Sequence, residues 1–388
     1  MRKVRIGDVG EIITGKTPKT SVSEYYNGKF PFLTPVDFNS LKIIKDTKKT
    51  ISKTGLESIK KCFIPKNSIC VTCIGSDMGK VAVNMMDCAT NQQINSVIPY
   101  KENDYNFIYY AIKNVSHLIK RMGEASTAVP IVNKTDFSNI YIYCPQKKEA
   151  QIKISSKLNS YDMKIENNID KIYCLMELIY TIFENYFDKY INTNNKQLLT
   201  SVFENITEIK EKNREEKNYT VLSVVKEGEF KASEDVFTKQ VYSKSTKNYK
   251  IVRRNQVAYN PARANIGSIA MLKEYDVGLV SPIYTVFEMK DTITPTFFYY
   301  YMKQPIFQEM IKHHAIGTTR QNFPFEAFKM FPMVVPPMEL QLKFEEIAKP
   351  IEQKIAKLKE ENEVLAEIRD TLLPKLMSGE LTVKVGEK

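Results

Sequence analysis

The sequence predicts a duplicated α+β chain, in which two similar mixed α/β segments are each followed by a long helix. Three observations support this fold class. Two apolar seams have helical spacing, parts of the chain repeat weakly after about 190 residues, and short β-branched stretches occur inside each globular segment. We expect the two long helices to pair as a coiled coil.

The first long helix is expected over residues 146–190, because no Pro or Gly follows Pro145 in that stretch. At about 1.5 Å per residue it would be roughly 65 Å long. Its apolar seam is too narrow for a core helix and is typical of a coiled coil. The seam consists of Leu158, Tyr161, Ile165, Ile169, Ile172, Met176, Ile179, Phe183, Tyr186 and Tyr190.

The second long helix is expected over residues 338–380. Pro350 lacks a backbone donor and predicts a bend near the start of this helix. Asn362 stands where an apolar residue is expected, and a buried Asn in such a seam fixes the register at some cost in stability. The seam consists of Leu340, Phe344, Ile347, Ile351, Ile355, Leu358, Asn362, Leu365, Ile368 and Leu372.

The two halves repeat in register, which predicts a duplicated domain. The segments beginning at Asn67, Gly79 and Phe107 align with those beginning at Asn255, Gly267 and Phe297. The predicted domains are therefore residues 1–145 and 198–337, with a linker at 191–197 and a tail at 381–388.

Short strands and helices are expected inside each globular segment. The predicted strands are Ile69–Ile74, Val81–Val83, Ile140–Tyr143, Tyr219–Val225 and Tyr284–Phe287. The predicted helical stretches are Phe107–Arg121 and Thr296–His314.

The net charge of +11 belongs to the globular segments. Residues 1–145 hold 20 Lys and Arg against 12 Asp and Glu, and residues 197–337 hold 19 against 15, whereas the helices are close to neutral. Two basic bodies separated by a neutral spacer favour a polyanion that is contacted at two places.

Composition also limits the class of protein. No run of eighteen apolar residues exists, so no membrane span is expected, and the N-terminus lacks the apolar block of a signal peptide. The six cysteines lie before Leu175 and are expected to be reduced thiols of a cytoplasmic protein. Cys70 and Cys73 have one metal-like spacing but no second pair, and the three histidines lack a triad pattern, so neither a metal nor a cofactor is expected.

Two motifs have a partial resemblance to catalytic sequences. Asn260-Pro-Ala-Arg263 resembles the motif of amino-methyltransferases, but Ala262 and Arg263 replace its second Pro and its aromatic residue. Gly75-Ser-Asp-Met-Gly-Lys80 is one residue too short for a phosphate loop, and Val81 replaces its Ser or Thr. A polar loop between two strands explains these glycines and can approach a DNA backbone closely.

Polar loops ahead of the long helices are the best candidates for base contacts, because Arg, Gln and Asn pair with guanine and adenine edges. Lysines and arginines nearby are candidates for phosphate contacts. The predicted nucleic-acid contacts are Ser76, Lys80, Ser126, Thr127, Lys134, Lys244, Lys247, Arg253, Arg254, Arg263, Asn265, Thr319, Arg320, Gln321 and Asn322.

Two stretches give the chain a family resemblance. The terminal run from Ile368 to Leu381 contains Leu-Leu-Pro-Lys-Leu-Met-Ser-Gly-Glu-Leu, and Pro336-Pro-Met-Glu-Leu-Gln-Leu342 opens the second helix. With the duplicated segments, this chain resembles the specificity subunit of type I restriction–modification systems. The first helix departs from the pattern, because Phe187-Asp-Lys-Tyr190 stands where the Leu-Pro-Lys-Leu ending would be.

The resemblance implies two target-recognition domains that each read one half of a split site in double-stranded DNA. It implies that the helices form an antiparallel coiled coil, which spaces the half-sites and docks two adenine-methyltransferase subunits, with restriction subunits added outside. It also implies no catalytic centre and no cofactor. The competing hypothesis is a structural adaptor, whose coiled coil holds protein partners without DNA readout.

Overall fold

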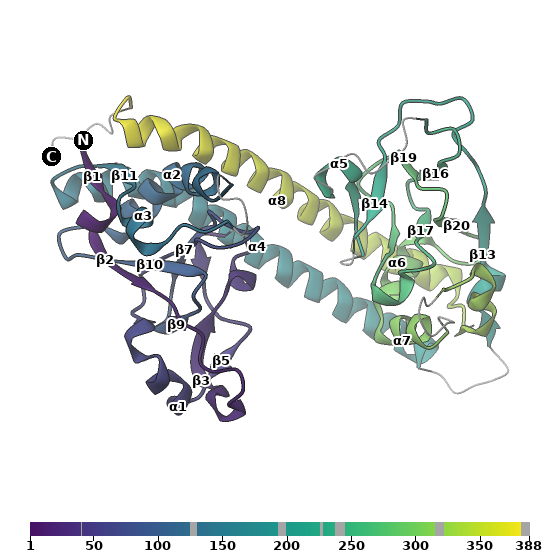
Figure 1. The fold of residues 1–388 in the computed structure, drawn as a ribbon. Coiled ribbons are helices and arrows are strands. Elements are labelled where there is room, and N and C mark those ends of the chain that lie inside the picture. The colour runs from purple at the N-terminus through teal and green to yellow at the C-terminus, as the bar shows by residue number, and fades with distance from the viewer. Residues whose placement is uncertain are drawn as a thin grey trace. The chain divides into compact units, whose positions relative to one another are not determined.

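The computed structural model describes residues 1–39, 41–124, 130–192, 199–225, 228–236, 245–314 and 322–381. The chain divides into two compact units (Figure 1). The first unit consists of Met1–Lys171 and Lys357–Lys388, and the second of Ile172–Ala356. None of the helices in the described ranges combines the length and the apolar character that crossing a membrane requires.

The first unit is built on a central sheet with strand order β2-β10-β7-β8-β4. Its strands alternate between two cores, because Ile69 and Val71 point to one face and Cys70 to the other. Two smaller sheets have the orders β1-β11 and β5-β3-β9-β6. The strands are β1 (Arg2–Arg5), β2 (Gly10–Thr14), β3 (Tyr26–Leu33), β4 (Ile43–Ile44), β5 (Thr50–Ile51), β6 (Phe63–Ile64), β7 (Ile69–Thr72), β8 (Val81–Asn84), β9 (Cys88–Thr90), β10 (Ile94–Pro99) and β11 (Tyr141–Cys144).

Helices cover one face of this central sheet. Phe107 and Ile112 of α2 (Tyr105–Glu124) and Phe137 of α3 (Lys134–Ser138) share a core with the sheet. Leu158 of α4 (Lys148–Ile191) and Leu373 of α8 (Met338–Ser378) belong to the same core. The last turns of α8 therefore pack in the first unit, far from it in sequence. The opposite face packs against the lobe that contains β3 and α1 (Lys53–Ser58).

The second unit repeats this arrangement with a central sheet of order β13-β20-β17-β18. Helices α6 (Pro295–Lys303) and α7 (Pro305–His314) cover one face together with Phe183 and Phe344 of the long helices. Smaller sheets of order β14-β15 and β16-β19 cover the other face, and β12 pairs with β21. The remaining elements are β12 (Thr200–Ser201), β13 (Ile206–Ile209), β14 (Leu222–Val224), β15 (Phe230–Ala232), α5 (Ser233–Val236), β16 (Lys250–Arg253), β17 (Val257–Tyr259), β18 (Ile269–Met271), β19 (Val277–Val280), β20 (Thr285–Met289) and β21 (Pro332–Met333).

The repeat seen in the sequence reappears in the backbone. Asn67 and Asn255 have φ values of 67° and 69°, and Gly79 and Gly267 have φ values of 87° and 95°. These left-handed positions are sparsely populated by other residues, so both halves preserve the same turns. The predicted helix over Thr296–His314 is wrong in one respect, because Pro305 divides it into α6 and α7.

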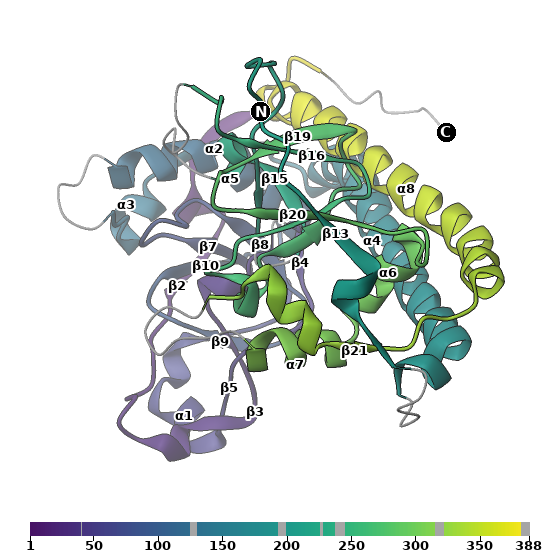
Figure 2. The same cartoon turned by 90° about the vertical axis from the view of Figure 1, so that its right-hand side faces the viewer.

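The two long helices pair in an antiparallel sense, as the fold class requires, and α8 continues through Pro350 (Figures 1 and 2). In the first unit, Asn168 Nδ2 lies 3.0 Å from Asn362 Oδ1, while the earlier Asp162 meets the later Arg369. The predicted seam is wrong at Met176 and Ile368, which are 38% and 40% exposed. Polar residues fill the seam instead, so apolar periodicity alone could not find Asn168 and Arg369.

A buried glutamine fastens each long helix to its unit. Gln151 Oε1 accepts the Asp104 N–H (2.8 Å), and its Nε2 donates to the Pro145 carbonyl (3.0 Å). Gln341 repeats this arrangement with the Thr294 N–H and the Pro336 carbonyl, both at 2.8 Å. Each glutamine satisfies backbone groups at the start of a covering helix and just before a long helix, so it fixes their relative position.

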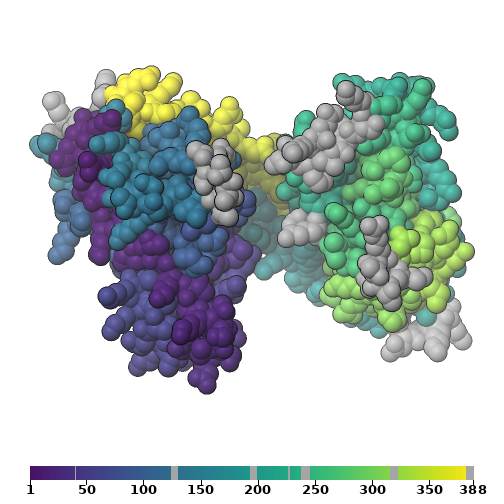
Figure 3. All heavy atoms as spheres, viewed as in Figure 1, coloured from purple at the N-terminus to yellow at the C-terminus, as the bar shows by residue number. Residues whose placement is uncertain are grey.

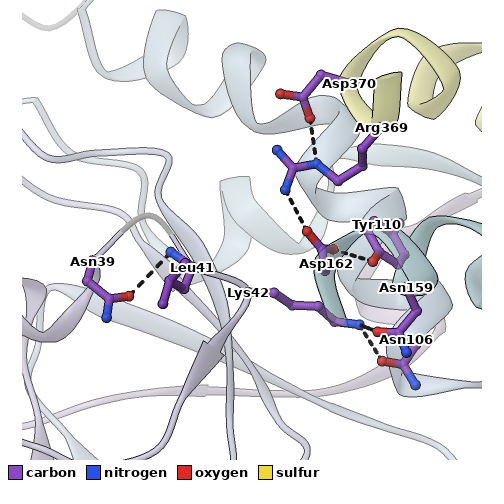
Figure 4. A network of polar contacts seen from close by, with 9 residues as sticks. All are labelled: Asn39, Leu41, Lys42, Asn106, Tyr110, Asn159, Asp162, Arg369 and Asp370. Carbon is purple, nitrogen blue, oxygen red and sulfur yellow. Dashed lines mark hydrogen bonds and ion pairs between the residues drawn. The ribbon is translucent and has the colours of Figure 1, made fainter. Parts of the chain in front are cut away.

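A second repeated contact joins a tyrosine pair to a carboxylate on the long helix. In the first unit, Asp162 accepts hydrogen bonds from the Tyr110 hydroxyl and from Arg369, and Lys42 donates to Asn106 and Asn159 at 2.6 and 2.5 Å (Figure 4). Burial lowers the pKa of Lys42 to about 8, although nearby Asp162 opposes this shift.

The second unit contains the equivalent of this contact. The Tyr300 hydroxyl donates to Glu352 at 2.9 Å, and Lys273 contacts Glu352 at 2.6 Å and lies 4.1 Å from the centre of the Tyr299 ring. Lys42 precedes β4 whereas Lys273 follows β18, so the two lysines come from different elements. In each unit, a tyrosine hydroxyl thus donates to a carboxylate on a long helix, and a lysine lies nearby.

Four buried thiols should make the first unit sensitive to alkaline pH. Burial raises the pKa of Cys73 and Cys88 to about 12 and that of Cys144 to about 11, and it also raises the pKa of Cys70. Unfolded cysteine releases its proton near pH 8.5, so the folded state binds more protons above that pH and stability falls as pH rises.

We expect the free energy of unfolding of this unit to fall by about 3 kcal/mol between pH 8 and pH 9.5. This value allows for Lys42, whose lowered pKa makes a smaller contribution of the opposite sign. Denaturation followed by circular dichroism in a reducing buffer measures this. Cys73→Ala should remove about 1 kcal/mol of the fall. The control Cys174→Ala, at an exposed position, should leave the pH dependence unchanged. Equal pH dependence in both variants would contradict the expectation.

Candidate nucleic-acid interface

One end of the central sheet in the first unit gathers several polar loops. Thr14 pairs with Asn95 and Thr72 pairs with Ile94, so the end of β2, the end of β7 and the start of β10 lie side by side. We call this edge the loop end. The opposite edge is the helix end, where Gln151 of α4 contacts Asn103 at 3.0 Å.

The connection from β7 to β8 is held in shape at the loop end. Gly75 and Gly79 have φ values of 90° and 87°, which L side chains rarely adopt. The hydroxyl of Thr72 accepts the Lys80 N–H (2.9 Å) and donates to the Asp77 carbonyl (2.6 Å). These contacts close the loop and leave Ser76 exposed at its tip.

A second segment adjoins this loop, because the Gly75 N–H donates to the Pro130 carbonyl at 3.1 Å and the Val132 N–H to the Cys73 carbonyl at 2.9 Å. Lys134 follows as the first residue of α3 and is exposed. Lys80 forms an ion pair with Asp77 at 2.8 Å, and this pair is exposed. The structure therefore brings the predicted residues Ser76, Lys80 and Lys134 to one end of the sheet.

Two glutamines at the loop end were missed by the sequence analysis. Gln92 is exposed, and its Oε1 accepts the hydroxyl proton of Thr17 at 2.5 Å. Gln93 is held by Asn91, whose Oδ1 accepts the Gln93 N–H at 3.1 Å. Glutamine can bond both edge groups of adenine, so these side chains suit base contact. Their signal was the run Asn91-Gln-Gln between two strands, which a search for glycines and basic residues passes over.

The second unit forms the equivalent loop end where Tyr259 pairs with Thr285. The β17–β18 connection spans Asn260 to Ser268, and the Phe323 N–H donates to the Pro261 carbonyl at 2.9 Å. Arg263 and Asn322 are exposed here and Asn265 is half-buried. These three predicted residues are therefore brought together, as their counterparts are in the first unit.

Asn260 has a structural role in this loop. Its Oδ1 accepts the Ala262 N–H at 3.0 Å, and the residue is 9% exposed. A side chain that closes its own turn in this way accounts for Asn260 without any catalytic function. The partial likeness to the methyltransferase motif thus has a local structural explanation.

Comparison with known proteins shows which proteins this chain is similar to. Residues 1–172 match the family model described as the type I restriction modification DNA specificity domain. The type I restriction enzyme MjaIX specificity subunit of Methanocaldococcus jannaschii is 24% identical over 98% of this chain and 93% of its own length.

The chain thus resembles the type I specificity subunits.

Two further similarities were found. The HindI specificity subunit of Haemophilus influenzae is 33% identical, over 42% of this chain and 36% of its own length. The crystal structure of a type I system S subunit from M. genitalium covers 97% of this chain and 96% of that chain, with 18% identity and a TM-score of 0.56. The structural likeness confirms the predicted fold class of two α/β domains and long paired helices.

Other predicted contacts of the chain lie away from its loop ends. Arg253 and Arg254 precede β17 and thus lie at the opposite end of this strand from Arg263. Arg253 is paired with Glu211 at 2.7 Å and Arg254 with Asp276 at 2.8 Å. Lys247 is exposed just before β16. Ser126, Thr127, Lys244, Thr319, Arg320 and Gln321 lie outside the described residues.

Metal-ligating side chains are dispersed. No group of three or more His, Cys, Asp or Glu residues in the described ranges has a geometry that could hold a metal ion. Cys70 points into the core between the sheet and its lobe, and Cys73 into the core beneath the helices. His313 and His314 contact each other at the end of α7, 5.0 Å apart between ring centres.

Proposed function

We propose that this chain is a type I specificity subunit that reads a split site in duplex DNA, and that each loop end contacts the bases of one half-site. The observation that carries the proposal is the repeated loop end. Both units place exposed polar side chains beside a loop of fixed backbone, with Gln92 and Ser76 in the first and Arg263 and Asn322 in the second. These residue types hydrogen-bond base edges in the major groove.

The paired long helices would then hold the half-sites at a set interval, so that intervening base pairs are counted without being read. Two major-groove contacts on one side of B-DNA suit a separation of about 34 Å or a multiple of it. By resemblance to its family, we propose that the subunit has no catalytic centre and positions two adenine-methyltransferase subunits, to which restriction subunits are added. Because cellular DNA is the proposed substrate, we also propose a cytoplasmic location.

Salt-dependent DNA binding tests this function. The full chain should bind duplex DNA with an affinity that falls steeply as salt concentration rises, because phosphate contacts release counterions. A structural adaptor would bind duplex DNA weakly and without sequence preference. Binding of S-adenosylmethionine by the purified chain in calorimetry would contradict the non-catalytic assignment.

Arg263→Ala should relax sequence choice at one half-site. Loss of a bidentate base contact costs about 1–3 kcal/mol of discrimination. The matched control is Arg254→Ala, because Arg254 is also exposed but lies at the other end of β17. Competition binding with duplexes that differ at single positions measures both variants. A relaxed preference in the control but not in Arg263→Ala would show that the wrong end of the sheet has been assigned.

A further inference from the structure

The positive charge of the first unit is concentrated in the lobe formed by residues 16–66. This lobe holds 11 lysines against 4 acidic residues. It includes β3, β5, β6 and α1 and also β4, the edge strand of the central sheet, and its purple and blue atoms are visible in Figure 3. Asp37 is buried at 8% exposure, and its carboxylate accepts the Thr34 and Lys48 N–H groups. Lys42 is buried as well, so the surface of the lobe keeps the whole excess of positive charge that its composition gives.

Most of these lysines have no neutralising partner. Lys42 is buried, and Lys45 lies 3.7 Å from Asp170. No carboxylate of the described residues lies within 4.0 Å of the other lysines, which are all exposed. They are Lys16, Lys19, Lys29, Lys48, Lys49, Lys53, Lys60, Lys61 and Lys66.

The corresponding segment of the second unit, residues 210–254, differs in this respect. It has 12 basic and 7 acidic residues, and several of its charges form pairs. Lys210 lies 3.0 Å from Glu208 and Lys217 lies 3.0 Å from Glu215, in addition to the pairs of Arg253 and Arg254. Four basic residues of this segment are thus paired with carboxylates, whereas in the first lobe Lys45 is the one lysine that lies within 4.0 Å of a carboxylate among the described residues.

Three unpaired lysines of the first lobe adjoin its loop end. The Lys16 N–H donates to the Thr90 carbonyl at 2.9 Å, and the next residue, Thr17, bonds Gln92. Lys60 and Lys61 belong to the 3-10 helix η4 (Lys60–Cys62), which contacts β2 and β9. The Lys16 ammonium also opposes the rise that burial causes in the pKa of the Cys62 thiol, as expected for a nearby cation.

We propose that Lys16, Lys60 and Lys61 hold the phosphate backbone of duplex DNA beside the half-site that the first unit reads. This inference rests on the proposed function. It adds a location on the protein for the phosphate contacts that supply the sequence-independent part of the affinity for DNA. Neighbouring cations repel one another in the free protein, and a phosphate row relieves that repulsion while it releases counterions. Because lysine acts as a point charge, the contacts add affinity without selecting a base.

The test compares two triple variants of the full chain that change the net charge equally. The first is Lys16→Gln, Lys60→Gln and Lys61→Gln. The control is Lys210→Gln, Lys217→Gln and Lys343→Gln, whose lysines are exposed and each paired with a glutamate. Binding to duplex DNA that carries the half-sites is measured as a function of salt concentration.

Each phosphate contact contributes about 0.9 to the slope of log affinity against log salt. The first variant should lose about two to three units of slope and keep its base preference, whereas the control should lose less than about one unit. Lys16→Arg, Lys60→Arg and Lys61→Arg should restore the slope. Equal slopes in the two glutamine variants would overturn this inference while leaving the proposed function intact. Absence of DNA binding by the unaltered chain would overturn both.

Discussion

Asp162→Ala is expected to destabilise the first unit by about 3–5 kcal/mol. The Asp162 side chain is 5% exposed, and it accepts hydrogen bonds from Tyr110 on α2 and from Arg369 on α8 (Figure 4). Its removal leaves the partly buried Arg369 guanidinium without its inner carboxylate and removes a negative charge near buried Lys42. A buried cation without its counter-charge is costly, whereas the loss of an exposed pair is not.

The matched control for this effect is Asp370→Ala. Asp370 also bonds Arg369, at 2.8 Å, but its side chain is 57% exposed, so a cost within about 1 kcal/mol is expected. The two units need not unfold together, and a single transition should not be assumed. Hydrogen exchange resolved by peptide should therefore show lost protection in α2, the first half of α4 and the last half of α8. Equal destabilisation by the two variants would contradict the role assigned to Asp162.

Lengthening both long helices is expected to change the interval between half-sites and not their bases. Four residues inserted after Lys171 in α4 and four before Lys357 in α8 fall at the boundary between the two units, so each unit keeps its own contacts. The insertion adds about 6 Å of helix, close to two base pairs of about 3.4 Å each. It also adds a rotation of about 40° beyond one turn, so some loss of affinity is expected.

The control inserts the same four residues into α4 alone. The register of the helices is set by the Asn168–Asn362 contact in the first unit and by the packing of Phe183 and Phe187 on Phe344 in the second. A one-sided insertion conflicts with one of these contacts and should abolish tight binding. Sequencing of DNA selected by the doubly lengthened chain measures the interval. Altered half-site bases at an unchanged interval would show that the helices do not set the spacing.

The sequence was sufficient to predict the duplicated α+β fold, from its internal repeat and its β-branched stretches, and the two paired helices, from their apolar periodicity. The limits of periodicity appear at Met176 and Ile368, which are exposed, and at Asn168 and Arg369, which replace apolar residues in the seam. These polar residues occupy the seam because each bonds a partner more than 190 residues away, namely Asn362 for Asn168 and Asp162 for Arg369. No local pattern encodes those pairings.

The candidate site was predicted less completely than the fold. Glycines and basic residues led to the β7–β8 and β17–β18 loops, where Ser76 and Arg263 lie at equivalent loop ends. The contribution of Gln92 and Lys16 could not be found in this way. Gln92 and Lys16 lie at the same loop end only because β2 and β7 both pair with β10. Strand pairing is a property of the folded chain. Arg253 and Arg254 were predicted from charge, which does not reveal the end of a strand on which a residue lies.

Selection of random duplex DNA by the full chain, followed by sequencing, tests the central claim most directly. The chain is examined alone and together with the methyltransferase subunits that it is proposed to position. The predicted result is two short conserved blocks separated by a fixed number of unselected base pairs. In the proposed account, each loop end reads the bases of one half-site and the paired helices set the spacing between the half-sites. A single contiguous block, or no enrichment in either preparation, would contradict the account.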